Sequence, residues 1–173
     1  MHNKTILING HAQTGKDTVI NIIKAYSAKK GIFVFACSTI DTFKHIAYDS
    51  FNWDGIKDEK GRQLLSDLKL SYTAYNKNFI LTFIENAKPQ VDWQVDTITI
   101  ICVRDIPELE QAKNFYRDEL ITLLITRPNL EKFNNVADAN VTNFNYDYTI
   151  HNDGSLEELK LKVEEFLNEI KDI

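Results

Sequence analysis

The residues with the clearest chemical potential stand near the start of the chain, in the stretch GHAQTGKDT. Gly10, Gly15 and Lys16 occur at the spacing G-x-x-x-x-G-K, which is typical of a loop that binds phosphate. Glycines let the backbone wrap a phosphate with its N–H groups turned inward, and the N-terminus of the following helix adds partial positive charge. Lys16 would then reach the β- and γ-phosphates of a nucleotide. The stretch predicts a phosphate-binding loop over residues 10–18.

One residue of this stretch departs from the motif. Asp17 stands where a serine or threonine normally offers a hydroxyl to magnesium. Asp17 can itself contact a hydrated magnesium ion, because this cation prefers oxygen ligands, or it can act only as a favourable charge in a first helical turn. Thr18 is an alternative hydroxyl donor, although one residue turns a helical side chain by about 100°. An acidic residue here is compatible with a magnesium-dependent site.

The elements that must position this loop follow from hydrophobic patterning. Residues 5–9 form a short apolar, β-branched run, and residues 16–29 carry apolar side chains at helical spacing. The further strand-like runs are 32–37, 97–103, 120–126 and 146–150. The further helical patterns are 41–51, capped by Thr39 or Asp41, then 63–69, 76–88, 107–116 and a last helix with a Ser155–Glu158 capping box. Five strands alternating with helices predict an α/β fold: a parallel five-stranded sheet with helices on both faces.

The predicted sheet also indicates where a ligand would bind. In such sheets ligands bind beyond the carboxyl ends of the strands. We therefore expect one edge to gather the segments that follow the strands, which are 10–16, 38–41, Arg104–Asp105, Arg127 and 152–154. A polar stretch with two glycines, residues 52–62, is expected to be a loop.

Length and composition limit the class of protein. A chain of 173 residues is expected to form a single domain, and its net charge of −5 argues against nucleic acid or an anionic membrane as a partner. The N-terminus has no signal-peptide pattern and no run is long enough to span a bilayer, so we expect a cytoplasmic protein. Cys37 and Cys102 are expected to be buried thiols without a disulfide or metal role.

Several stretches, taken in order, resemble one family. The pattern G-x-x-x-x-G-K-D resembles phage and bacterial deoxynucleoside monophosphate kinases and also animal-type phosphomevalonate kinases, within the P-loop group that is nucleoside monophosphate kinase-like. Three further stretches are similar to the first of these families: FNWDGIKDEKGRQLL (51–65), VRDIPELEQAK (103–113) and YDYTIHNDGSLEELKLKV (146–163).

The resemblance implies transfer of the γ-phosphoryl of ATP, with magnesium, to a (deoxy)nucleoside monophosphate. It implies catalytic roles for Lys16, Arg104, Arg62 and Arg127, with Lys57 as a further cation, and an acceptor-binding, lid-like helical region over residues 39–93. The donor would contact Gly10, His11, Ala12, Gln13, Thr14, Gly15, Lys16, Asp17 and Thr18, and also Asn152 and Asp153 near the base. Metal contacts would come from Asp17 and Asp105.

Alternatives remain open at several of these positions. Arg104 can bind the acceptor phosphate or pair with Asp105, and Asp105 can equally help to hold water around magnesium. Trp53 can stack on an acceptor base or anchor its own loop. The apolar helix FILTFI fits a homodimer contact or a buried core. The chain could instead phosphorylate another small acceptor such as phosphomevalonate. Because it has only four arginines, it could also be a catalytically silent nucleotide-binding regulator.

Overall fold

Strands and helices alternate along the chain. The structure is a computed structural model that describes residues 3–89, 95–128 and 141–170. The strands are β1 (Lys4–Asn9), β2 (Phe33–Ser38), β3 (Thr97–Cys102), β4 (Leu120–Thr126) and β5 (Tyr148–His151). The helices are α1 (Lys16–Ala28), α2 (Asp41–Phe51), α3 (Glu59–Tyr75), α4 (Phe79–Ala87), α5 (Ile106–Tyr116) and α6 (Leu156–Glu169), with 3-10 turns η1 (Arg117–Glu119) and η2 (Val141–Asn143).

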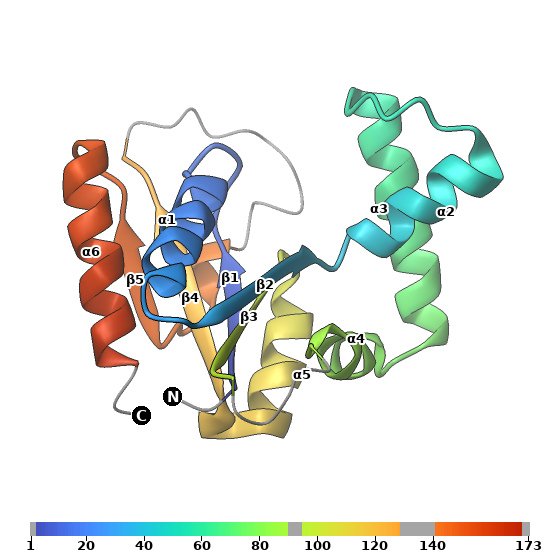
Figure 1. Cartoon of the computed structure of the whole chain (residues 1–173). Coiled ribbons are helices and arrows are strands. Elements are labelled where there is room, and N and C mark those ends of the chain that lie inside the picture. Colours follow the sequence, from blue (N-terminus) through green and yellow to red (C-terminus); the bar gives the residue numbers. More distant parts are fainter. Residues whose placement is uncertain (1–2, 90–94, 129–140, 171–173) are drawn as a thin grey trace.

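All five strands form one parallel sheet in the order β2-β3-β1-β4-β5 (Figure 1). β1 lies in the centre, where Ile6 pairs with Ile100 of β3 on one side and Ile121 of β4 on the other. The central strands are buried along almost their whole length because helices cover both of their faces. The carboxyl end of β1 therefore lies between the carboxyl ends of β3 and β4.

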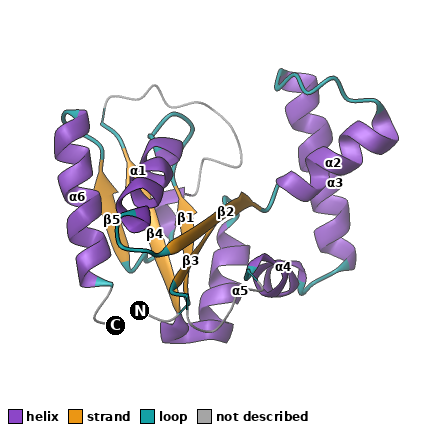
Figure 2. Ribbon diagram, viewed as in Figure 1, coloured by secondary structure: helices purple, strands orange, loops and turns teal. Residues whose placement is uncertain are grey.

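Helices cover both faces of the sheet, which gives three layers (Figure 2). On one face, α1 and α6 contribute Ile23 and Val163 to a core with the strands. On the other face, α4 and α5 contribute Ile80, Ile84 and Leu109. The expected α/β fold is confirmed, and the apolar residues of FILTFI face a core within the chain. No helix in the described part of the chain is long and apolar enough to cross a membrane.

The two helices α2 and α3 stand beside the sheet and are called here the α2–α3 arm (residues 41–75; Figure 1). The arm has a small core of its own, formed by Phe43, Ala47, Trp53, Leu65 and Phe79. Phe79 belongs to α4, so this helix joins the arm to the body of the protein. The expected helical region 39–93 thus corresponds to α2, α3 and α4, and its residues 90–93 lie outside the described residues.

The start of α3 differs from the sequence prediction. The loop expected over 52–62 is shorter, because the helix begins at Glu59 after Asp58, whose carboxylate accepts the Gly61 N–H at 2.8 Å. Gly61 does not break the helix. A Cβ at this position would lie 2.2 Å from the Ile56 carbonyl oxygen and 2.8 Å from Trp53 Nε1, so glycine is needed for close packing.

Other boundaries also differ. α3 continues to Tyr75 rather than ending at 69, and α4 spans Phe79–Ala87 rather than 76–88. α2 has Ile40 at its N-cap rather than Thr39 or Asp41, because the Asp41 carboxylate accepts the Ser38 N–H at 2.8 Å instead of capping the helix. β5 begins at Tyr148 rather than at 146, because the Asp147 carboxylate accepts the N–H and the hydroxyl of Thr122 on β4, each at 2.8 Å. The Ser155–Glu158 capping box at the start of α6 is confirmed.

The packing at Gly61 gives a stability prediction. We expect Gly61→Ala to lower the free energy of unfolding by about 1–3 kcal/mol, because the added methyl overlaps the Ile56 carbonyl and Trp53. Urea unfolding followed by tryptophan fluorescence measures this change. Ser66→Ala, at an exposed position of the same helix, is the matched control and should stay within about 0.5 kcal/mol of the parent chain. Equal stability of the two variants would contradict the packing described here.

Candidate functional site

The loop between β1 and α1 has a conformation that needs its two glycines. Gly10 has φ +150° and Gly15 has φ +97°, values that L side chains rarely adopt. A Cβ at Gly10 would lie 2.4 Å from the Ile125 carbonyl oxygen, and one at Gly15 would lie 2.5 Å from Asn152 Nδ2. Both glycines are therefore required by backbone conformation and by space.

The ammonium group of Lys16 lies over this loop. Its Nζ donates hydrogen bonds to the carbonyl oxygens of Gly10 at 2.5 Å and His11 at 2.6 Å. The loop precedes the N-terminus of α1, whose first N–H groups have no partners within the helix. A cation, a helix N-terminus and a loop that curls back on itself thus meet at one point, which is the arrangement that binds phosphate.

Two asparagines brace the loop from either side. Asn9, fully buried at the end of β1, accepts the Gly10 N–H at 2.7 Å and donates to Tyr146 Oη at 2.9 Å and the Arg104 carbonyl at 3.3 Å. Asn152, after β5, donates to the Thr14 carbonyl at 2.9 Å. Sequence reasoning placed Asn152 near a donor base and missed the brace that its amide provides to the loop.

Tyr146 completes the support of Asn9. Its hydroxyl donates to the Val141 carbonyl at 2.8 Å while it accepts from Asn9. Burial raises the pKa of the Tyr146 hydroxyl to about 12, so it stays protonated and can keep donating at neutral pH. Neither Asn9 nor Tyr146 was identified from sequence. The available signal was a polar residue at the end of an otherwise apolar strand.

The acidic and hydroxyl groups expected near magnesium lie at the start of α1. Asp17 and Thr18 are both exposed in the first turn, directly after Lys16. In the described part of the chain, no group of three or more His, Cys, Asp or Glu side chains is positioned to hold a metal ion. Magnesium usually binds through one or two carboxylates together with substrate phosphates and water, and an oxygen donor beside the phosphate loop fits that coordination.

Two of the three expected arginines follow the strands on either side of β1. Arg104 comes two residues after the end of β3, and Arg127 comes directly after β4; both side chains are exposed. Arg62 instead lies in the first turn of α3, on the α2–α3 arm, where its Nε donates to the Lys57 carbonyl at 2.9 Å. The carboxyl ends of the strands thus gather Lys16, Arg104 and Arg127, while Arg62 lies on a separate element, α3.

Asp105 has a partner that the sequence did not indicate. Its carboxylate contacts the ammonium of Lys69, a buried lysine of α3 that also donates to Glu108 and Thr39.

Two further residues singled out from the sequence have partners within the chain. Asp153, expected near the donor base, pairs with Lys162 at 2.5 Å. Trp53 donates from Nε1 to the Ile56 carbonyl at 3.1 Å and packs on Tyr48, so it anchors its own loop.

Both cysteines are free thiols that lie partly buried on neighbouring strands. Cys102 packs with the α1–α6 face of the sheet and Cys37 with the α4–α5 face, so the two are not arranged for a disulfide. Burial raises the pKa of Cys37 to about 12 and that of Cys102 to about 11. Protonated thiols are poor nucleophiles, which agrees with the structural role expected from sequence.

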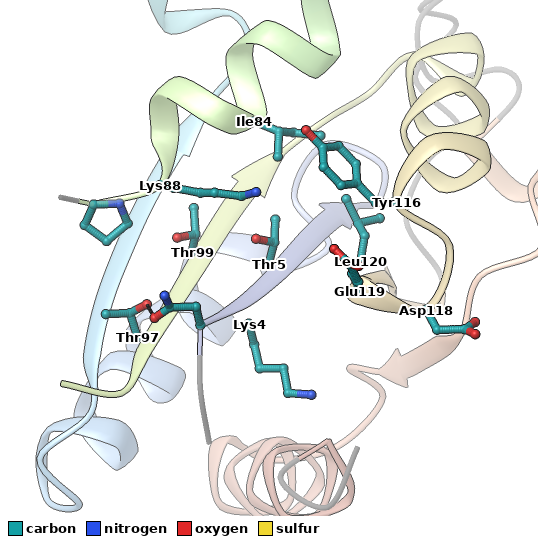
Figure 3. Close-up of a pocket in the computed structure, with 12 residues that line it drawn as sticks. Lys4, Thr5, Ile84, Lys88, Thr97, Thr99, Tyr116, Asp118, Glu119 and Leu120 are labelled. Carbon is teal, nitrogen blue, oxygen red and sulfur yellow. Dashed lines mark hydrogen bonds between the residues drawn. The ribbon is translucent and has the colours of Figure 1, made fainter. Parts of the chain in front are cut away.

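A cavity lies at the opposite end of the strands. A cavity of about 470 Å³ opens at the amino ends of β1 and β3, with Thr5, Thr99, Lys88 and Tyr116 in its lining (Figure 3). Ligands of parallel α/β sheets bind at the carboxyl ends of the strands, which is where the glycine loop and the arginines lie. We therefore assign the candidate site to the loop edge.

Comparison with known proteins supports the fold. No protein-family model matches the chain, and no curated protein does. Among solved structures, APS kinase CysC of Mycobacterium tuberculosis in complex with AMPPNP and APS is similar with a TM-score of 0.54 and 14% identity, over 96% of this chain and 98% of that chain. A sugar kinase from Janibacter is similar with a TM-score of 0.51 and 14% identity, over 96% and 95%. The chain has the fold of the P-loop kinases.

The geometry of the loop predicts the effect of a single methyl group. We expect Gly10→Ala to abolish measurable ATP binding, because its Cβ would overlap the Ile125 carbonyl and displace the loop backbone. Calorimetry with ATP and magnesium measures this. The control is Gly31→Ala, which also has positive φ (+71°) but no atom within 4 Å of the added methyl, so binding should persist. Unchanged ATP binding in Gly10→Ala would mean that residues 10–18 do not hold the donor.

Proposed function

We propose that the chain transfers the γ-phosphoryl of ATP to a (deoxy)nucleoside monophosphate in a magnesium-dependent reaction. One observation carries this proposal. A phosphate-type loop follows the central strand β1, and an arginine follows each neighbouring strand, Arg104 after β3 and Arg127 after β4. Cations on both sides of a phosphate loop suit a group that passes between two phosphorylated substrates.

The donor would lie on the loop. Backbone N–H groups of residues 10–18 and the Lys16 ammonium would hold its phosphates, since both groups lie at the N-terminus of α1. Asn152 braces the loop through Thr14, and with Asp153 it follows β5 at the same edge, where a donor base could approach. The kinase fold and the complex of one structural neighbour with AMPPNP support ATP as the donor.

Magnesium would be held beside the loop. Asp17, or Thr18 in its place, offers an exposed oxygen donor in the turn that follows Lys16. Asp105 would contact the ion only through water, because one side of its carboxylate already contacts Lys69. When bound, the ion would neutralise charge on the donor phosphates.

Catalysis then requires little covalent chemistry from the chain. Lys16 would hold the donor phosphates, and Arg104 and Arg127 would neutralise the charge of the migrating phosphoryl group from the flanking strand ends. An in-line attack by a phosphate oxygen of the acceptor needs no strong base, so positioning and charge neutralisation suffice. The raised pKa values of both thiols make a cysteine nucleophile unfavourable here.

The acceptor side is assigned to the helices of residues 39–93. Arg62, with Lys57 beside it, would close over the acceptor phosphate from the arm. The resemblance of residues 51–65, 103–113 and 146–163 to deoxynucleoside monophosphate kinases favours a nucleotide acceptor over phosphomevalonate. A catalytically silent nucleotide-binding regulator is the second candidate, and the observation that favours it is the small number of arginines, four in the whole chain.

A coupled assay of ADP release tests this function. The chain is incubated with ATP and magnesium against a panel of nucleoside and deoxynucleoside monophosphates and phosphomevalonate. We expect turnover with one or a few of the nucleoside monophosphates. Turnover with phosphomevalonate alone would move the assignment to the other kinase family, and ATP binding without turnover on any acceptor would favour the regulator.

Arg104 separates an enzyme from a nucleotide sensor. We expect Arg104→Ala to lower kcat by roughly 10²–10³-fold while ATP binding persists, since removal of one preorganised charge donor has an effect of that order. Steady-state kinetics and calorimetry measure the two quantities. Arg117→Ala is the matched control, because Arg117 precedes β4 at the opposite edge of the sheet. An unaltered rate in Arg104→Ala would contradict its proposed role at the acceptor phosphate and the migrating phosphoryl group.

A further inference from the structure

A buried ion cluster joins the α2–α3 arm to the edge of the sheet. Lys69, in the middle of α3, is only 9% exposed. Its Nζ donates to Glu108 Oε2 at 2.8 Å, to Thr39 Oγ1 at 3.2 Å and to Asp105 Oδ2. Thr39 follows β2, while Asp105 and Glu108 lie at the start of α5, so one ammonium group connects three segments.

The ammonium has no capacity left for a substrate. A lysine carries three N–H donors and no acceptor, and the three contacts of Lys69 use all three donors. Its stem is enclosed as well, given the low exposure of the whole residue. Lys69 therefore fixes the position of other groups and does not itself bind phosphate.

The Asp105 side chain contacts Lys69 instead of capping α5. It occupies the N-cap position of α5, where an aspartate side chain normally accepts an N–H of the first helical turn, yet it makes no such bond. Its carboxylate turns to Lys69 instead and remains 42% exposed beside Arg104. The contact thus sets the orientation of the acidic group that follows the strand-end arginine.

The cluster is not an arrangement that stability alone would favour. It has one ammonium for two carboxylates, and Glu108 Oε1 is buried with no hydrogen-bond partner within the described residues. Burial raises the pKa of Glu108, although Lys69 partly offsets this rise. Replacing a buried ionic cluster with apolar residues is often neutral or stabilising, so its presence points to a role in geometry.

The place of Lys69 in α3 indicates what it positions. Arg62 lies seven residues earlier on the same helix, about 10 Å along its axis at 1.5 Å per residue. Because a helix is stiff over two turns, fixing Lys69 against Asp105 also fixes how far Arg62 stands from Arg104. The two arginines belong to different elements, and the Lys69 cluster is a polar link between those elements.

We propose that Lys69 is a positioning residue that sets the α2–α3 arm, with Arg62, relative to Arg104 and Asp105 at the sheet edge. This inference rests on the proposed function, in which the arm carries the acceptor. The contacts that hold the phosphate loop, from Asn9 and Asn152, do not involve Lys69. Loss of Lys69 is therefore expected to affect the acceptor more than the donor, which depends on Lys69 only through the proposed water-mediated contact of Asp105 with magnesium.

The first test is the change Lys69→Met, which keeps the unbranched stem, one atom shorter, and removes the charge. We expect the KM for the best acceptor of the panel to rise roughly 10- to 100-fold, while the KM for ATP changes much less. Lys160→Met, an exposed lysine of α6, is the matched control and should change neither constant. An equal change in both KM values, or in neither, would overturn the proposal.

Stability is separated from positioning by a double variant. Lys69→Met alone leaves two carboxylates without their cation, so it also destabilises the fold. Lys69→Met with Glu108→Leu removes the buried charge and should recover stability in urea unfolding, yet the acceptor KM should remain raised because Asp105 still lacks its partner. If the acceptor KM returns to the parent value together with stability, Lys69 acts only through stability and the proposal fails.

Amide hydrogen exchange provides a readout that needs no activity. In the same double variant, we expect faster exchange in residues 59–75 of α3 and unchanged exchange in β1 and α1. Unchanged exchange in α3 would overturn the link between arm and sheet. If the parent chain phosphorylates nothing in the panel, the proposed function fails on its own terms, and the exchange result still decides whether Lys69 holds the arm.

Discussion

The buried side chain of Asn9 connects the parts of the molecule on which the candidate site depends. It lies at the end of the central strand, fully removed from solvent, and each of its polar atoms has a partner. Through Oδ1 it holds the first N–H of the phosphate loop, and through Nδ2 it holds the carbonyl of Arg104 and the hydroxyl of Tyr146. Because an unpartnered amide is costly at such a depth, the strand ends of β1 and β3 and the segment before β5 must keep their relative positions. The glycine loop, with its positive φ values, is then held on a fixed base.

The positive charge at the candidate site comes from a few nearby side chains and not from the net charge of the chain. The chain has a net charge of −5, so its overall field does not attract a phosphorylated ligand. Lys16, Arg104 and Arg127 are instead brought to one edge by three adjacent parallel strands, where the N-terminus of α1 adds its partial charge. Acidic groups nearby are held by lysines of other elements: Asp105 by Lys69 of α3, and Asp153 by Lys162 of α6. These pairs limit the negative charge that a bound phosphate would meet.

Much of the fold followed from the sequence because its signals are local. The β-branched runs of β1, β3 and β4 and the capping box of α6 each depend on a few adjacent residues, and all were predicted close to their observed bounds. The start of α3 was not, because Gly61 has the appearance of a helix breaker until the Ile56 carbonyl and Trp53 are packed against it. The late start of β5 also depends on a distant partner, since Asp147 bonds to Thr122 across the sheet. In both cases a tertiary contact, and not the local sequence pattern, set the boundary of the element.

The sequence by itself determined the fold class, the phosphate loop and the placement of Arg104 and Arg127 at strand ends, since spacing and strand order along the chain suffice for those inferences. Only the tertiary structure decided which groups support the loop and which element carries Arg62. Asn9, Tyr146 and Lys69 carry no motif in the sequence, and the hydrogen bonds by which they join different elements span 30 to 137 residues. A hydrogen bond between such distant residues exists only after the sheet has set its strand order and the arm has packed against α4. Local sequence patterns do not indicate which distant residues will form hydrogen bonds. The phosphate loop could therefore be recognised from the sequence, while the residues that support it could not.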